Sequence, residues 1–200
     1  MTQSESETSN SDLEQILKYK DEFYETNKKN VFFKSSQKRE CAESICNKIS
    51  LVDLMNQTFW IVPNKNQMYF DYRIFKLYGH PANYNEIVDN VLRFCSWCID
   101  QYGDFEIHVN LASFTVSGAE RYRDIIICFC EECTRRVILF STKLTTMNLY
   151  NIPNSIDQIS KLLLPLIPPE VRPKLRLHKK EDSGDRLTQI YADSGKTYVA

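Results

Sequence analysis

The sequence predicts an α/β fold: a mixed, mostly parallel sheet flanked by helices, with a small helical layer at the N-terminus. From residue 58 onwards, short aromatic or β-branched runs alternate with helical stretches. Connections of helical length join parallel neighbours in a sheet, so this alternation favours a parallel core. The 200 residues, 42% of them hydrophobic, fit one domain of ordinary globular composition.

The first residues predict a tail and then two helices. Residues 1–10 are polar without periodicity, which is typical of disorder. Ser11-Asp12-Leu13-Glu14 has the pattern of a capping box, so we expect a helix to begin there. A second helix is expected over residues 37–55, which carry an apolar stripe. The N-terminal helical layer therefore spans residues 11–57.

The α/β part is expected over residues 58–180. Strands are predicted at 58–63, 68–75, 105–111 and 145–150, and a helix at 83–102 that Gly103 ends. Residues 105–111 give the cleanest alternation of apolar and polar residues. A second capping box, Ser117 to Glu120, predicts the start of the next helix. Residues 181–200 contain two glycines and several aspartates and predict a loosely structured tail.

The stretch around which the chain is organised runs from 147 to 180. A short strand stops at Asn151-Ile152-Pro153, because proline has no backbone donor and favours extended geometry before it. An apolar helix follows and ends at Pro168-Pro169. After it the chain is extended and basic. The pattern suits either a movable lid over an apolar cavity or an ordinary core helix.

Composition excludes several classes. A formal net charge of −1 gives no global electrostatic case for binding nucleic acid. No apolar run approaches the roughly 18 residues of a membrane span. The acidic, hydroxyl-rich N-terminus does not resemble a signal peptide, so a cytoplasmic protein is expected.

The seven cysteines lie in apolar segments, as reduced core cysteines do. The alternative is zinc bound by Cys95, Cys98 and the group Cys128, Cys130 and Cys133. These segments read as apolar helices rather than as the tight turns of zinc knuckles. We therefore expect no metal and no cofactor other than a bound lipid.

The residues that an enzyme would need are not found in a recognisable pattern. The five glycines form no phosphate loop or nucleophile elbow. Cys130 and Arg136 have the spacing of a phosphatase loop, but Glu131 and Glu132 between them would repel a dianion. His108, on the polar side of its strand, reads as a solvated or hydrogen-bonded histidine. We expect no catalytic residues and no enzymatic activity.

Residues 58–180 resemble the CRAL-TRIO lipid-binding family, which includes phosphatidylinositol-transfer proteins. The likeness rests on the strand 107–115, on Tyr150-Asn151-Ile152-Pro153, and on the helix that ends in Leu164-Pro165-Leu166-Ile167-Pro168-Pro169-Glu170. The sequence departs from the family at Asn110, where Asp is frequent, and lacks the family's C-terminal glycine-rich segment.

The resemblance implies a lipid-binding or lipid-transfer domain that holds a phospholipid or other hydrophobic molecule between sheet and gate helix. The implied lipid-binding residues are Phe70, Ile107, Val109, Leu111, Phe114, Met147 and Leu149. The implied gate residues are Ile159, Leu162, Leu163 and Leu166. The alternative is a degenerate fold with a filled core that serves as a protein-interaction or scaffold module and binds a protein partner.

The basic stretch 172–180 predicts peripheral contact with anionic membranes. The expected head-group contacts are Lys174, Arg176, Lys179 and Lys180. If the segment is extended, Arg172, Lys174, Arg176 and His178 share one face while Leu175 and Leu177 point into the fold. The other reading is a solvated edge strand, where lysine discourages edge pairing.

Overall fold

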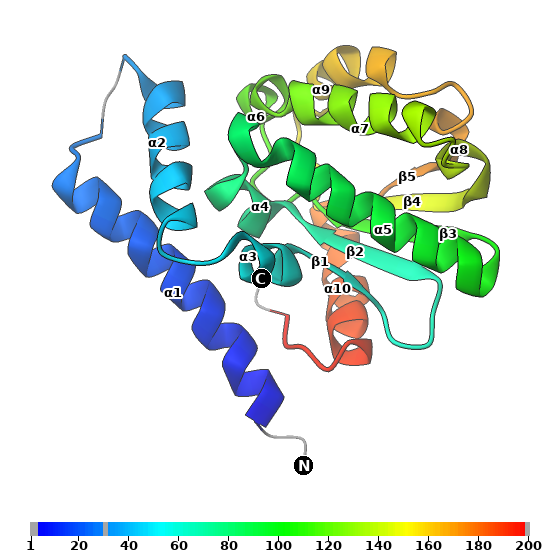
Figure 1. Cartoon of the computed structure of the whole chain (residues 1–200), viewed down its shortest axis with the longest axis horizontal. Helices are drawn as coiled ribbons and strands as arrows, with labels where there is room; N and C mark the ends of the chain where they lie inside the picture. Colours follow the sequence, from blue (N-terminus) through cyan, green and yellow to red (C-terminus); the bar gives the residue numbers. More distant parts are fainter. Residues whose placement is uncertain (1–3, 30–31, 199–200) are drawn as a thin grey trace.

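A five-stranded sheet forms the centre of the molecule in the computed structural model, which describes residues 4–29 and 32–198 (Figure 1). Its strands are β1 (Phe59–Ile61), β2 (Gln67–Asp71), β3 (Phe105–Asn110), β4 (Leu144–Tyr150) and β5 (Leu175–Leu177). They lie in sequential order; β1 is antiparallel to β2, and the other pairs are parallel. The predicted fold class, a mixed and mostly parallel sheet flanked by helices, is confirmed.

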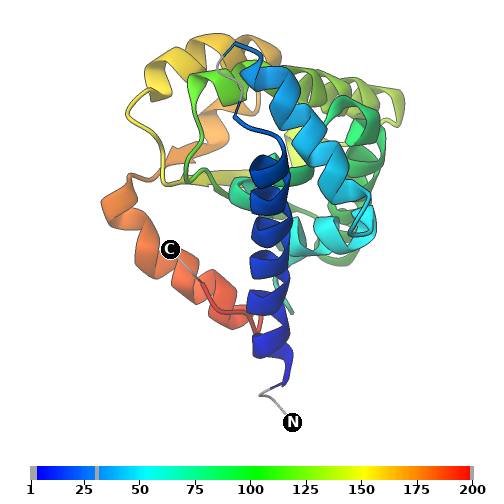
Figure 2. The same ribbon diagram turned by 90° about the vertical axis from the view of Figure 1, so that its left-hand side faces the viewer.

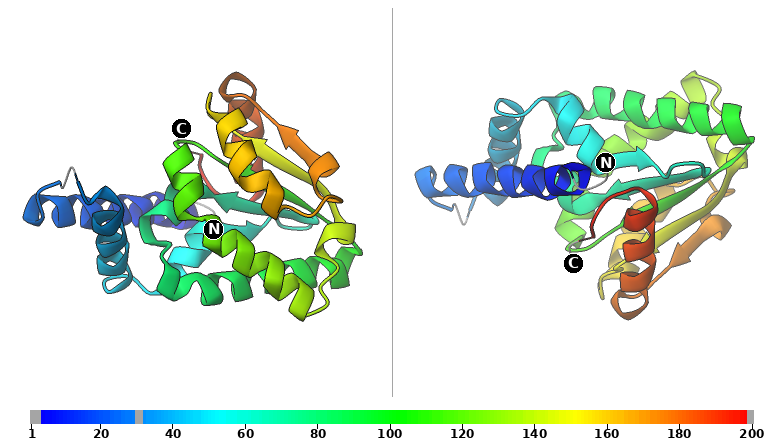
Figure 3. Two further views of the ribbon diagram at one scale, coloured as in Figure 1. Left: turned by 90° about the horizontal axis from the view of Figure 1, so that it is seen from above. Right: turned by 90° about the horizontal axis from the view of Figure 1, so that it is seen from below.

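Helices cover both faces of the sheet. They are α1 (Ser4–Thr26), α2 (Lys34–Cys46), α3 (Leu51–Thr58), α4 (Tyr72–Tyr78), α5 (Tyr84–Tyr102), α6 (Val116–Arg121), α7 (Arg123–Arg135), α8 (Phe140–Lys143), α9 (Ile156–Leu163) and α10 (Lys180–Asp193), with 3-10 turns at Pro81–Asn83, Leu164–Leu166 and Arg172–Lys174. Helices α5 and α7 pack together, and α10 lies on the opposite face of the sheet from α5 (Figure 3).

The main core lies on the α5 side of the sheet. Residues of β3 alternate between the faces, so Phe105, Ile107 and Val109 enter this core. In register, Val109 stands between Phe70 of β2 and Leu149 of β4, which forms an apolar row across three strands. Sequence alternation in this strand therefore predicted the apolar face correctly, but His108 and Asn110 on the polar face are buried as well.

Helix α10 was not predicted. Leu187, Ile190 and Tyr191 on this helix are buried against Trp60 and Tyr69 of the sheet. The expectation of a loosely structured tail over 181–200 is wrong for residues up to Asp193, because the aspartates and Gly184 that suggested it occupy the exposed side of the helix. The apolar residues are few, but their helical spacing places them on one face.

The strand predicted at 68–75 changes into helix α4 after Asp71. The Asp71 carboxylate accepts a hydrogen bond from the backbone N–H of Arg73 (2.8 Å), as an N-cap does. It also pairs with the Arg73 guanidinium (2.9 Å) and accepts from the Tyr191 hydroxyl (2.8 Å). Asp71 is fully buried and thus joins the sheet, α4 and α10 at one point.

Other boundaries also differ from those expected. Helix α1 already contains residues 4–10 of the tail predicted to be disordered, so the pattern at Ser11 does not start a helix; residues 1–3 lie outside the described part. Two helices, α2 and α3, replace the single helix predicted over 37–55, and Ser50 is the N-cap of α3. The N-cap of α6 is Thr115 rather than Ser117, because its hydroxyl accepts from the N–H of Gly118 (3.1 Å).

Helices α1 and α2 form a hairpin at one end of the molecule. They lie side by side in front of the α/β body in Figure 2 and project from it in Figure 3. Helix α2 packs on α4, and α1 contacts α3 and α4. The hairpin therefore stands beside the carboxyl end of β2, where α4 begins.

Candidate functional site

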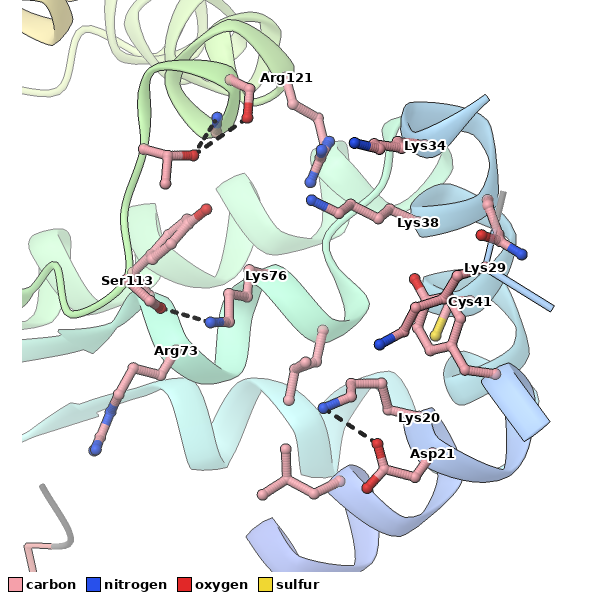
Figure 4. A pocket seen from close by; sticks show the side chains of 18 of the residues that line it. Lys20, Asp21, Lys29, Lys34, Lys38, Cys41, Arg73, Lys76, Ser113 and Arg121 are labelled. Atoms are coloured by element: carbon pink, nitrogen blue, oxygen red, sulfur yellow. Dashed lines mark hydrogen bonds and ion pairs between the residues drawn. The ribbon is translucent and has the colours of Figure 1, made fainter. Parts of the chain in front are cut away.

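A groove of about 1170 Å³ separates the α1–α2 hairpin from α4 and from the segment 112–121 (Figure 4). It lies at the carboxyl ends of the parallel strands β2 and β3. Ligands of open α/β sheets bind in crevices at this edge, because the connecting segments there supply the polar groups. The position of the groove therefore makes it a candidate ligand site.

Among the charged residues that line this site, which we call the basic groove, cations outnumber acids. Its cationic side chains are Lys20, Lys29, Lys34, Lys38, Arg73, Lys76 and Arg121. Its lining contains two acids, Asp21 and Glu25. The chain as a whole has a net charge of −1, so this concentration of positive charge is local.

Two of the cations are neutralised by partners. Arg73 is paired with Asp71 and points away from the centre of the groove in Figure 4. The ammonium group of Lys20 lies 3.3 Å from a carboxylate oxygen of Asp21. The excess charge therefore comes from the remaining lysines and from Arg121.

Lys38 on α2 and Arg121 on α6 point towards each other with Lys34 beside them, whereas the ammonium group of Lys76 on α4 points towards Ser113 (Figure 4). Lys76 donates a hydrogen bond to the Ser113 hydroxyl (2.6 Å), a neutral acceptor. Lys38 makes no hydrogen bond or ion pair within residues 4–29 and 32–198, and the buried Nε of Arg121 has no hydrogen-bond partner in the same ranges. These groups retain donors for a ligand.

The pKa values of two groove lysines reflect the excess of positive charge in the groove. Burial lowers the pKa of Lys38, and the neighbouring cations Arg121 and Lys34 lower it further. Burial likewise lowers the pKa of Lys76, with Lys20 as the next cause. A shift of this sign means that the protein disfavours the charged lysine, so a bound anion would relieve an unfavourable interaction.

The wall formed by residues 112–121 has an unusual backbone. Ser113 has a φ of +66°, in the left-handed region that costs a non-glycine residue about 1 kcal/mol or more. Gly118 allows a close approach, since a Cβ there would lie 2.7 Å from the Tyr72 hydroxyl oxygen. Local strain of this kind concentrates at functional sites, although it does not identify a ligand.

The basic groove was missed in the sequence because its cations come from distant segments. One signal was present: Lys34 and Lys38 are four residues apart on α2, and Arg73 and Lys76 are three apart on α4. Like charges at these spacings destabilise a helix by a few tenths of a kcal/mol.

The residues expected to hold a lipid lie in the main core instead. Ile107, Val109, Leu111 and Phe114 are buried, and the half-buried Phe70, Met147 and Leu149 pack against the same cluster. Phe70 contacts Phe59 and Phe75, with ring centroids 4.8 and 5.5 Å apart. None of these residues lines the basic groove.

The expected gate residues belong to α9 and the turn after it. Ile159 is buried in the main core, and Leu162 and Leu163 are half-buried against it. Leu166 is half-buried in the 3-10 turn Leu164–Leu166, which contacts α7. Helix α9 itself lies against α6.

The basic stretch 172–180 does not form the expected row. Lys174 turns inward and donates to the carbonyl oxygens of Ser141 (2.7 Å) and Leu144 (2.5 Å). The prediction that Leu177 points into the fold is wrong, because Leu177 is 51% exposed. The alternation assumed a strand over the whole stretch, whereas β5 has three residues and follows a 3-10 turn.

The other expected head-group contacts remain on the surface. The Arg176 guanidinium donates to the carbonyl oxygens of Pro173 (2.8 Å) and Leu175 (3.0 Å). Lys179 and Lys180 are exposed at the start of α10. Arg176, Lys179 and Lys180 are therefore exposed, whereas Lys174 is engaged with backbone carbonyl oxygens.

A second polar cluster lies on the α10 side of the sheet. Nδ1 of His108 is 2.9 Å from the Tyr150 hydroxyl, and its Nε2 is 3.7 Å from a Glu106 carboxylate oxygen. The Tyr150 ring stacks on both His108 and His178. The expectation that His108 is a hydrogen-bonded strand histidine is confirmed.

The cysteines are free thiols. Burial raises the pKa of Cys41, Cys46 and Cys98 to about 11 and that of Cys133 to about 12. Within the described ranges, no group of three or more His, Cys, Asp or Glu residues is arranged to hold a metal ion. No helix of the described chain is both long and apolar enough to cross a membrane.

Comparison with models of known protein families gives no match, and comparison with curated proteins gives none either. The CRAL-TRIO resemblance thus stays a prediction.

Proposed function

We propose that this chain is a non-enzymatic binding domain for anionic phospholipids, and that the basic groove holds the phosphorylated head group. The observation that carries the proposal is that Lys38, Lys76 and Arg121 line one groove and have no carboxylate partner among the described residues. Lysine and arginine form their strongest hydrogen bonds with phosphate and carboxylate oxygens. A ligand with several phosphates suits a site that collects this many cations.

The core beside α9 is filled by side chains, so the acyl chains of a lipid find no ready space inside the fold. Ile107, Val109 and Leu111 are each 9% exposed and pack with Phe114 and Ile159 in one cluster. Tails could enter the region beside α9 only after these side chains separated. We therefore place recognition at the head group and treat lipid transfer, with α9 as gate, as an additional step of the same proposal.

The proposal assigns no chemistry to the protein. Reactive cysteines have lowered pKa values, whereas burial raises the pKa of Cys41 and Cys133. His108 contacts the Tyr150 hydroxyl through Nδ1 and is buried in the sheet face away from the basic groove. Both features favour a binding role.

Vesicle co-sedimentation tests the proposal. Phosphatidylcholine vesicles that contain phosphatidylinositol bisphosphate should sediment the protein, and phosphatidylcholine alone should not. Attraction of this kind is screened over about 8 Å at physiological ionic strength, so binding should weaken as salt rises. Equal binding to both vesicle types, or binding that does not depend on salt, would contradict a head-group site.

The lowered lysine pKa values predict a pH dependence. A bound phosphate prefers the protonated lysine, so affinity should fall as pH rises through the pKa of Lys38 and Lys76. This fall should begin below the range of an ordinary lysine, whose pKa is about 10.4. The variant with Lys38→Arg and Lys76→Arg should keep its affinity at alkaline pH, because arginine stays charged.

Isothermal titration with inositol trisphosphate at increasing pH measures this dependence for the wild type and the arginine variant. Parallel curves for the two proteins would show that other groups cause the change.

A further inference from the structure

The outer end of the α1–α2 hairpin exposes two phenylalanines. Phe32 is 91% exposed and Phe33 is 68% exposed, just before α2 begins at Lys34. Exposed aromatic side chains in adjacent positions gain free energy when their apolar surface leaves water. Figure 3 shows the end of α1 and the start of α2 at the extremity of the molecule.

The same end is strongly basic. Residues 26–39 contain Lys28, Lys29, Lys34, Lys38 and Arg39, and no acidic residue. Three of these cations, Lys29, Lys34 and Lys38, also line the basic groove. The hairpin end and the basic groove thus form one continuous cationic surface.

Hydrogen bonds hold the two sides of the hairpin end together. Nε2 of Gln37 donates to the carbonyl oxygens of Asn27 (3.2 Å) and Lys28 (2.9 Å). The backbone N–H of Asn27 still continues the helical pattern to Phe23 (2.8 Å). The end of α1 is therefore fixed to the first turns of α2, which reduces the entropy that docking would cost.

We infer that this hairpin end docks on an anionic bilayer, with Phe32 and Phe33 inserted at the level of the head groups. The inference rests on the proposed function and adds to it the element that brings the basic groove to the membrane. Aromatic side chains favour the interfacial region, and each lysine or arginine close to an anionic surface contributes about 1 kcal/mol. Basic residues surround the two rings, so apolar and electrostatic attraction act at one place.

Charge selects a bilayer over a protein as the occupant. The apolar surface consists of two side chains, which is small for a protein interface, whereas the charged residues within 26–39 are all positive. An anionic membrane matches both properties and is also where the proposed ligand resides. A lipid head group in the groove would then keep its acyl chains in the bilayer.

The test compares a double variant with a matched control. Phe32→Ser with Phe33→Ser removes the two exposed rings, and Val137→Ser with Leu139→Ser removes two exposed apolar residues between α7 and α8 (80% and 52% exposed). Affinity is measured for phosphatidylinositol bisphosphate vesicles and, separately, for soluble inositol trisphosphate. Circular dichroism checks that each variant is folded.

We expect the phenylalanine variant to bind vesicles about 10–100-fold more weakly than the wild type, as the loss of two partly inserted rings implies. Its affinity for soluble inositol trisphosphate should not change, and the control variant should match the wild type in both assays. The variant Phe32→Trp should in addition show a blue-shifted tryptophan emission when vesicles are added.

Three results would overturn the inference. Unchanged vesicle binding by the phenylalanine variant would do so while leaving the proposed function intact. An equal loss for vesicles and for soluble inositol trisphosphate would make the rings part of the basic groove rather than a membrane contact. A wild-type protein that binds neither would remove the proposed function and, with it, the docking inference.

Discussion

Replacing both Lys38 and Lys76 by glutamate is expected to lower the affinity for inositol trisphosphate by at least about 100-fold. Each change removes a charge-assisted hydrogen bond, worth about 1.5–3 kcal/mol, and adds a repulsive carboxylate. The two side chains reach the groove from α2 and α4, so the ligand would lose contacts on both walls. Isothermal titration calorimetry measures the change.

The control for this experiment is the variant with Lys161→Glu and Lys180→Glu. It reverses the charge of two lysines that do not line the groove. Both are exposed, and Lys180 belongs to the set first expected to contact head groups. The control should bind as the wild type does. Because burial and neighbouring cations lower the pKa values of Lys38 and Lys76, the groove variant should unfold at a similar or higher temperature. If both variants lose affinity equally, net charge rather than the groove decides binding.

Replacing Asp71 by alanine is expected to reduce the free energy of unfolding by about 3–5 kcal/mol. Removal of one partner from a buried ion pair leaves the other charge uncompensated, and Arg73 would be that charge. The N-cap of α4 and the acceptor of the Tyr191 hydroxyl are lost in the same change. Urea denaturation followed by circular dichroism measures the difference.

Asp193→Ala is the matched control, since Asp193 pairs with Lys65 (2.6 Å) near the end of α10. This pair is more accessible to water than the Asp71–Arg73 pair, so its loss should reduce the free energy of unfolding much less. Equal destabilisation by the two changes would mean that Asp71 is not the point where sheet, α4 and α10 are joined.

The sequence predicted those elements in which the hydrophobic pattern continues over the whole length of the strand or helix. The alternation in residues 105–111 and the apolar stripe of 83–102 correspond to β3 and α5 within a residue at each end. Helix α4 was misjudged because Tyr72 and Ile74 continue the alternation of β2, whereas the cap at Asp71 starts a helix. The hydrophobic pattern of the sequence does not reveal that Asp71 forms a buried ion pair with Arg73 and caps α4.

The candidate site was beyond sequence reasoning for a different reason. The most basic local stretch, 172–180, attracted the membrane prediction, but Lys174 uses its ammonium group to bind backbone carbonyl oxygens. The basic groove instead forms only when the α1–α2 hairpin folds back onto α4 and residues 112–121. Charge density along the chain is therefore a poor guide to charge density in space.

The most direct test of the central claim is an NMR titration of the wild-type protein with inositol trisphosphate. Backbone amide signals of the groove walls, in particular of Lys38, Lys76 and Arg121, should shift in a saturable way, and those of residues 172–180 should not. Signals that shift instead around Ile107, Phe114 and Ile159, or no shifts at all, would contradict a head-group site in the basic groove.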